Sequence, residues 1–154
     1  MDKLRKDNRY KCPKCKSLQN ATKRLSVTSA PQILIVTIKR FDIFGRKITK
    51  NIRYPSAFNM KNFMDGYIDS QTAIAKSKAS SKAKAQVSAA QETQNVIYDL
   101  YGVVIHKGSS TNSGHYFSYC KAASNKGWYE CNDSYISPMS ENAVLNKEAY
   151  LLFY

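Results

Sequence analysis

The pattern of apolar and polar positions along this chain predicts mainly β-strands. A β-branched apolar run over 33–38, directly behind Pro31, predicts a strand that is buried on both faces. The remaining elements predicted from the pattern are strands over Tyr98–Ile105, Gly114–Lys121 and Trp128–Cys131, a short helix over Glu141–Asn146, and a second buried strand over Ala149–Tyr154.

Small and turn-forming residues mark three connections. Asn125-Lys126-Gly127 predicts a hairpin turn that leads into the strand at Trp128. Phe44-Gly45-Arg46-Lys47 predicts a turn, and Gly108–Ser113 predicts a loop of small residues. Together with the strands, these connections predict an α+β fold built on a mostly antiparallel sheet with few helices.

Residues 66–95 differ in composition from the rest of the chain. They are rich in Ala, Ser, Lys and Gln, hold no aromatic residue after Tyr67, and show no sustained apolar face. They predict a flexible insertion, and a solvent-exposed helix is the alternative, because Ala, Lys and Gln favour helices. The sequence thus predicts one domain, with an N-terminal part over 1–24, a body over 25–65 and 96–154, and this insertion.

The net charge of +13 is high for 154 residues. Nine Lys and Arg residues oppose two Asp residues in the first 24 positions. Such a charge favours acidic partners by long-range attraction, and the alternative is a solvated basic surface without a dedicated partner.

Cysteine usage and the N-terminus predict an intracellular location. Met1 is followed by charged residues instead of an apolar signal segment, and no apolar run approaches the length of a membrane span. The four cysteines are therefore expected to be free or bound to metal in a reducing compartment.

The chemistry-bearing residues gather around two strands near the C-terminus. Gly114-His115-Tyr116 places an imidazole next to the small-residue loop, where it can act as a general base. Asn132 and Asp133 end the neighbouring strand, and either side chain can orient that imidazole. A lone histidine in a strand is more often structural, but the preceding glycine and the polar pair favour a catalytic base.

No cysteine is a convincing nucleophile for this base. Side chains alternate across a strand, and His115 and Cys120 are separated by an odd number of residues, so they should face opposite ways. If Asn132 faces His115, then Cys131 faces away. Both thiols are predicted to be small buried hydrophobic groups. Elsewhere, Cys12 and Cys15 have the spacing of a zinc knuckle but supply only half of a tetrahedral site.

These motifs, taken in order, resemble the C-terminal half of a ubiquitin-specific protease catalytic domain, with the closest similarity to the Scrawny-type nucleolar subgroup. The resemblance rests on Tyr10–Cys15, Ala21–Arg24, the strand from Pro31 to Phe41, Lys47-Ile48, Tyr54-Pro55, Tyr98–Val104, His106–Gly108, Gly114–Tyr116, Trp128-Tyr129 with Asn132-Asp133, and Ala149–Tyr154.

The resemblance implies the palm of a papain-like hydrolase, a partial fingers region over 1–24, and no thumb. It implies that His115 is the catalytic base and Asn132 the orienting residue, with Asp133 as a substitute. It further implies that the ubiquitin tail is contacted by Phe44, Gly108, Gly114 and Tyr116. No cofactor is needed for such catalysis, and zinc is expected only at the incomplete site of Cys12 and Cys15.

The family's N-terminal Cys box is absent from these residues, so the resemblance implies no hydrolysis by this chain alone. Expected partners are ubiquitin, ubiquitinated proteins and an N-terminal half that bears the cysteine, in the nucleus, nucleolus or cytoplasm. The alternatives are a non-catalytic ubiquitin-binding remnant and a basic zinc-knuckle module that binds nucleic acid. The last is disfavoured because residues 1–24 lack interleaved aromatic residues and a full ligand set.

Overall fold

A computed structural model describes residues 2–67 and 95–154. The chain divides into two compact units, one of Met1–Ser29 with Lys61–Thr93 and the other of Ala30–Met60 with Gln94–Tyr154. The predicted insertion at 66–95 lies almost entirely outside the described residues. No helix in the described part of the chain has the length and apolar character that a membrane crossing requires.

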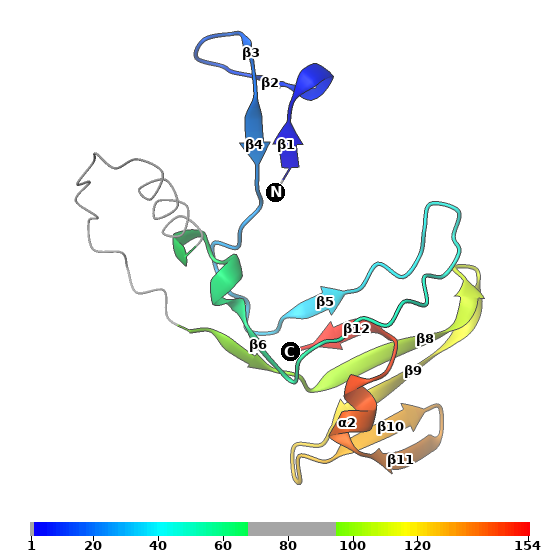
Figure 1. Cartoon of the computed structure of the whole chain (residues 1–154). Helices are drawn as coiled ribbons and strands as arrows, with labels where there is room; N and C mark the ends of the chain where they lie inside the picture. Colours follow the sequence, from blue (N-terminus) through cyan, green and yellow to red (C-terminus); the bar gives the residue numbers. More distant parts are fainter. Residues whose placement is uncertain (1, 68–94) are drawn as a thin grey trace. The chain divides into compact units, whose positions relative to one another are not determined.

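A six-stranded antiparallel sheet forms the largest part of the second unit (Figure 1), and the sequence predicts a mostly antiparallel sheet. Its strands, in spatial order, are β11 (Tyr135–Met139), β10 (Trp128–Asn132), β9 (Ser113–Lys121), β8 (Gly102–Ser110), β12 (Ala149–Phe153) and β5 (Ile35–Thr37). The predicted hairpin through Asn125-Lys126-Gly127 is confirmed, because β9 and β10 pair with Lys121 opposite Trp128.

The apolar run at 33–38 forms an edge strand and is not buried on both faces as predicted. β5 pairs only with β12 within the sheet, and Ile33 and Ile35 are more than half exposed. A continuous apolar run is typical of a central strand, and the sequence pattern does not reveal how many neighbours a strand will have.

The predicted single strand Tyr98–Ile105 is two strands. β7 (Ile97–Asp99) pairs with β6 (Ala57–Asn59) in a separate two-stranded sheet. The chain then changes sheets at Leu100, whose backbone N–H donates to Ser56. Leu100 is fully buried where the chain passes between the sheets. The run of apolar residues therefore continues through the break, which is why the sequence predicts one strand.

The predicted loop at Gly108–Ser113 is mostly strand. β8 continues to Ser110 and β9 begins at Ser113, with an irregular register between Lys107 and Ser110 that accommodates an extra residue. β11 was not predicted, and it is an edge strand that contains Pro138, a position that proline tolerates because its missing N–H is not needed there.

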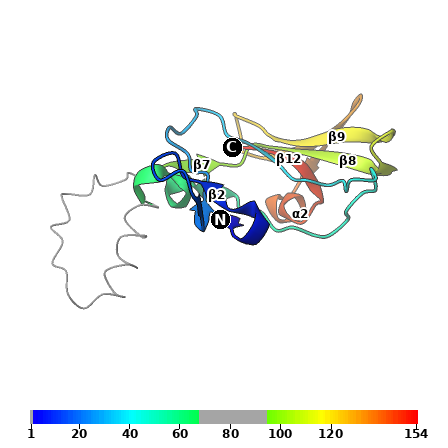
Figure 2. The ribbon, with the colours of Figure 1, turned by 90° about the horizontal axis from the view of Figure 1, so that it is seen from above.

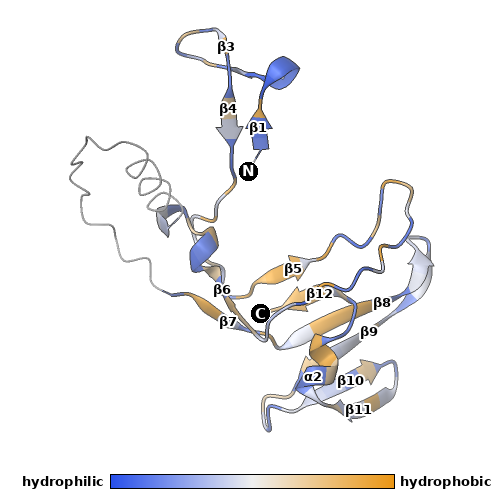
Figure 3. Cartoon of the chain, in the orientation of Figure 1, coloured by the Kyte–Doolittle hydropathy of each residue, from blue (hydrophilic) through white to orange (hydrophobic). Residues whose placement is uncertain are grey.

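One face of the sheet carries the core. Val103, Tyr119, Trp128 and Leu152 are at most 3% exposed, and the register places them on the same face. The predicted short helix is confirmed as α2 (Glu141–Leu145), which Ser140 caps at its N-terminus. Figure 2 shows α2 to one side of the sheet, and Figure 3 shows the apolar stretches of β5, β8 and β12.

The first unit consists of short hairpins. β1 (Asp2–Leu4) pairs with β4 (Ala21–Lys23), and β2 (Tyr10–Lys11) pairs with β3 (Leu18–Gln19). Single-turn 3-10 helices occur at Lys6–Asn8 and Met60–Phe63. Asp65 accepts hydrogen bonds from Ser26 and Thr28. These bonds join the two stretches of chain that make up this unit, one ending at Ser29 and the other beginning at Lys61.

Candidate active site

His115 and Asn132 meet on one face of the sheet. His115 is the third residue of β9 and Asn132 is the last residue of β10. The Nε2 atom of His115 lies 2.5 Å from Oδ1 of Asn132, and the ring of Phe117 stacks beside the imidazole at 6.3 Å. The prediction that these two side chains come within hydrogen-bond distance is therefore confirmed.

This contact determines which imidazole nitrogen is free. The amide Oδ1 only accepts hydrogen bonds, so Nε2 of His115 must donate its proton to Asn132. In a neutral imidazole the other nitrogen, Nδ1, then carries the lone pair. The arrangement can present a base at Nδ1 while Asn132 holds the ring from the opposite edge.

Asp133 lies farther from the imidazole. Its Oδ2 atom is 3.7 Å from Nε2 of His115, and the Asp133 side chain is 79% exposed. Asp133 sits in the turn between β10 and β11 with a φ of +52°, a conformation that Asp and Asn tolerate better than most residues. Its carboxylate can act on His115 by charge, but that distance exceeds a hydrogen bond.

The thiols of the sheet point away from His115, as the strand parity predicts. Cys120 pairs with Tyr129 and Cys131 pairs with Ser118, which places both cysteines on the face opposite to His115 and Asn132. The prediction that they are buried is wrong, because Cys120 is exposed and Cys131 is only partly buried.

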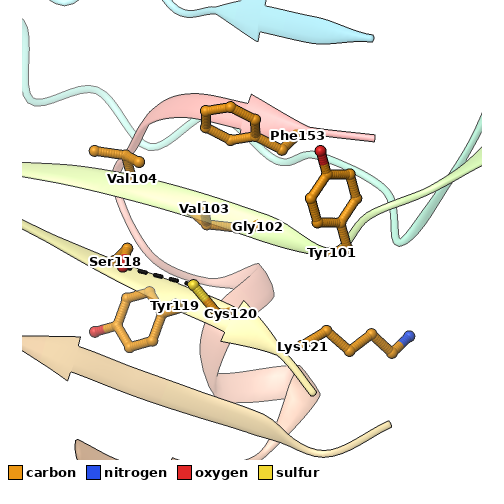
Figure 4. Close-up of a pocket in the computed structure, with 9 residues that line it drawn as sticks. All are labelled: Tyr101, Gly102, Val103, Val104, Ser118, Tyr119, Cys120, Lys121 and Phe153. Carbon is orange, nitrogen blue, oxygen red and sulfur yellow. Dashed lines mark hydrogen bonds between the residues drawn. The ribbon is translucent and has the colours of Figure 1, made fainter. Parts of the chain in front are cut away.

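A cavity of about 310 Å³ lies beside Cys120. Figure 4 shows the hydrogen bond between the Cys120 thiol and the Ser118 hydroxyl at this cavity. Phe153, Tyr101 and Gly102 also line it. Burial and the neighbouring Cys120 thiol raise the pKa of Cys131. The Cys131 thiol is thus not activated as a nucleophile, and this cavity lies on the face opposite to His115.

The segments predicted as a turn at Phe44–Lys47 and as a loop at Gly108–Ser113 contact one another directly. Lys47 donates its backbone N–H to Ser109 at 3.0 Å, and Thr111 donates to Gly45 at 3.2 Å. Gly45 has a φ of +74°, which a glycine adopts without strain. Its absent side chain also matters, because a Cβ would lie 3.0 Å from Oγ1 of Thr111.

The residues predicted to contact the ubiquitin tail lie in or near these two segments and at the start of β9. Phe44 is 75% exposed in the turn, where the guanidinium of Arg46 covers its ring at 5.2 Å. Gly108 lies at the irregular part of β8, and Gly114 directly precedes His115. Tyr116 is 53% exposed and projects from the face opposite to His115.

Two residues next to the site, Lys47 and His106, had no predicted role. Lys47 donates from Nζ to the backbone oxygen of His106 at 2.6 Å and lies 3.6 Å from the carboxylate of Glu148. His106 itself is buried. The only signal in the sequence was the presence of both residues in family-like motifs, since their contacts join segments about 60 to 100 positions apart.

Cys12 and Cys15 lie in the turn between β2 and β3. Hydrogen bonds from Ser17, first from its side chain and then from its backbone, lower the pKa of the Cys15 thiol to about 7. Over residues 2–67 and 95–154, no group of three or more His, Cys, Asp or Glu side chains is placed to hold a metal ion. The described residues therefore do not complete a tetrahedral zinc site, which needs four ligands.

Comparisons with known proteins identify a family. The family model of ubiquitin carboxyl-terminal hydrolases matches residues 3–154. The probable ubiquitin carboxyl-terminal hydrolase 16 of Schizosaccharomyces pombe is 36% identical over 99% of this chain and 28% of its own length. Ubiquitin carboxyl-terminal hydrolase 8 of Saccharomyces cerevisiae is 36% identical over 97% of this chain and 29% of its own length.

A solved structure agrees with these relatives. The SAGA Ubp8/Sgf11/Sus1/Sgf73 DUB module bound to ubiquitin aldehyde contains a chain that is 35% identical to this one. The ubiquitin-aldehyde complex matches with a TM-score of 0.69 over 98% of this chain and 30% of that chain. This chain therefore spans less than a third of the length of the relatives it matches.

Proposed function

Because the chain belongs to the ubiquitin carboxyl-terminal hydrolase family, we propose that it supplies the base and the orienting amide of a cysteine-type deubiquitinase. The observation that carries the proposal is the 2.5 Å contact between Nε2 of His115 and Oδ1 of Asn132, which leaves Nδ1 available as a base. Asn132 is the orienting residue, since the Asp133 carboxylate is 3.7 Å away and largely exposed.

The chemistry of this proposal places the nucleophile outside β9 and β10. Cys120 and Cys131 face away from His115, so the attacking thiol comes from a segment that resembles the family's N-terminal Cys box. Nδ1 of His115 takes the thiol proton, and the thiolate attacks the carbonyl carbon of the C-terminal glycine of ubiquitin, which breaks the isopeptide bond to the lysine. The imidazolium then returns the proton to the leaving lysine amine, and water hydrolyses the thioester.

In this proposal the chain corresponds to the C-terminal half of the catalytic domain, with the sheet as the palm and the hairpins of 1–24 as a partial fingers region. Its partners are ubiquitin and ubiquitinated proteins, in line with relatives solved in complex with monoubiquitin. The free thiols of the described residues suit an intracellular compartment, and we propose the nucleus, including the nucleolus of a Scrawny-type enzyme. Catalysis needs no cofactor, and zinc would bind only with ligands from beyond the described residues.

Mixing experiments test the function directly. The chain is combined with a separately expressed N-terminal half of a relative that bears the Cys box, and a fluorogenic ubiquitin substrate reports hydrolysis. We expect turnover by the mixture, none by the chain alone, and loss on His115→Ala. Cys120→Ser is the matched control, because that thiol lies on the opposite face and its removal should leave turnover unchanged.

A non-catalytic ubiquitin-binding remnant is the second candidate. It is favoured if the mixture forms no complex and shows no hydrolysis that depends on His115, while the chain alone is still retained on a ubiquitin column. Turnover by the chain alone that survives His115→Ala would contradict both candidates.

A further inference from the structure

His106 is the histidine of this chain, other than His115, to which no function has been given so far. It is 2% exposed in β8. His106 pairs with Tyr116, and its neighbour Lys107 pairs with His115. Because side chains alternate along paired strands, the two imidazoles project from opposite faces of the same hairpin.

Aromatic rings enclose the His106 imidazole. The ring centroid of Tyr116 lies 4.7 Å away, that of Phe41 lies 5.3 Å away, and that of Tyr150 lies 6.4 Å away. These rings come from β9, from the segment after β5 and from β12. The imidazole is thus held at a point where three separate segments meet.

The remaining edge of the imidazole lies against a glycine backbone. A Cβ atom built at Gly114 would collide with Nε2 of His106, and one at Gly108 would lie 2.9 Å from its Cε1. Gly114 has a φ of +155° and directly precedes His115. The ring therefore occupies the space that a side chain at 114 would need, and it touches the backbone from which His115 departs.

Packing alone is a weak reason for a histidine here. Within the described part of the chain, Nδ1 of His106 is buried without a hydrogen-bond partner. Burial of such an atom costs free energy, and an apolar side chain would fill the same enclosure without that cost.

We propose that His106 is a positioning residue whose ring fills the space behind Gly114 and so holds the start of β9 where His115 meets Asn132. The inference deepens the proposed function, because the contact that His106 maintains is the one proposed to be catalytic. It predicts that the reach of the residue 106 side chain toward Gly114 controls the His115–Asn132 contact.

Two amide variants separate this role from a purely structural one. A glutamine side chain reaches about as far as imidazole Nε2, whereas an asparagine side chain ends near the position of Nδ1. His106→Gln therefore still reaches Gly114, and His106→Asn does not. A residue that only stabilises the core would lower the Tm in both variants without moving His115 relative to Asn132.

The first measurement uses the chain alone. Each variant retains a single imidazole, so its ring signals in NMR spectra of the isotope-labelled chain belong to His115. We expect the nuclear Overhauser contact between the His115 ring and the Asn132 side-chain amide to persist in His106→Gln and to disappear in His106→Asn. His106→Leu, which keeps an apolar group within the aromatic enclosure but ends short of Gly114, replaces the asparagine variant if that one does not fold.

The second measurement uses the mixture with the Cys-box half. His106→Asn should lower kcat by roughly 10–100-fold with little change in KM, because a misplacement of about 1 Å at a catalytic group can cost about 10²-fold. Retention of the NMR contact in His106→Asn and His106→Leu, or its equal loss in His106→Gln, would overturn the inference. If no mixture hydrolyses the fluorogenic ubiquitin substrate, the proposed function fails, and the NMR comparison still decides the role of His106.

Discussion

At the scale of single residues, the distances to His115 distinguish Asn132 from Asp133, although either side chain could orient the imidazole as judged from the sequence. Asn132 ends a strand whose pairing directs its side chain toward His115, whereas Asp133 begins the following turn. The sequence places a carbonyl and a carboxylate side by side, and the geometry of the turn gives the short contact to Asn132.

The first prediction compares these two residues in the mixture with the Cys-box half. Asn132→Ala should lower kcat by roughly 10²–10⁴-fold, the range seen when an orienting or general-base function is lost. Asp133→Ala should change kcat only a few-fold, since its exposed carboxylate interacts through solvent. A greater loss in Asp133→Ala than in Asn132→Ala would show that the carboxylate is the orienting group.

A second residue-scale prediction concerns Cys15, whose thiol pKa is lowered to about 7 by hydrogen bonds from Ser17. About half of this thiol should be thiolate near pH 7, so alkylation by iodoacetamide should rise with pH through that value. The pKa of Cys131 is raised, so its labelling should require higher pH. Mass spectrometry of labelled peptides measures both rates.

Ser17→Ala is the control for this titration. Removing the hydroxyl should move the Cys15 labelling curve to higher pH and leave the Cys131 curve in place. Because folding lowers the pKa of Cys15, its contribution to stability is present above the unfolded thiol pKa and is lost as pH falls through about 7. Identical curves for the variant and the parent chain would argue against the hydrogen bonds as the cause.

At the scale of elements, one buried arginine joins segments that no local pattern connects. Arg40 is 1% exposed. Its Nε donates to the backbone oxygen of Ala149 at 2.9 Å, and its Nη1 donates to those of Ile48 and Lys50 at 3.3 and 2.5 Å. The guanidinium thus fastens the segment after β5 both to the start of β12 and to the chain that follows the 41–47 turn, which the bridge between Phe41 and Lys47 closes.

The third prediction is that Arg40→Met lowers the free energy of unfolding by about 3 kcal/mol, because several buried carbonyl oxygens lose their donor. Urea denaturation followed by circular dichroism measures the loss. Arg46→Met is the matched control, since Arg46 pairs with Asp42 at 2.8 Å but is 74% exposed, and such surface pairs contribute about 0–1 kcal/mol. Equal effects of the two substitutions would contradict the role given to Arg40.

At the scale of the whole molecule, the large positive charge opposes self-association of the chain, whereas the apolar edge strand β5 promotes it. The net charge of +13 favours separation of copies. Leu34 forms backbone hydrogen bonds with Tyr154, and Ile38 donates its backbone N–H to Tyr150. The alternate residues Ile35 and Thr37 therefore turn their backbone N–H and C=O groups away from the sheet. Ile35 is 55% exposed there, and an apolar edge of this kind promotes association between strands.

The fourth prediction is that the chain associates increasingly as NaCl is raised, because salt screens the charge repulsion. Ile35→Lys should reduce association, since a lysine on an edge strand opposes pairing with another chain. Ile43→Lys adds the same charge at a 93% exposed isoleucine in the 41–47 turn and should reduce association less. Sedimentation velocity at several salt concentrations measures both, and equal effects would assign the change to net charge alone.

Short-range patterns predicted much of the second unit. The turns at Phe44–Lys47 and Asn125–Gly127, the helix after Ser140 and the strands that became β9, β10 and β12 all follow from local preferences for turns, caps and alternation. Strand parity also placed Cys120 and Cys131 on the face opposite to His115, because that inference needs only the two-residue period of a strand.

The sequence by itself determined the alternation that sorts residues between the faces of each strand, the turn positions and the family-like order of motifs, since these depend on neighbours within a few positions. Only the tertiary structure decided that β5 is an edge, that Cys120 is exposed, and that Asn132 instead of Asp133 touches His115. It also placed His106 behind Gly114. These features depend on which distant segments pack together, and apolar character alone does not specify that choice.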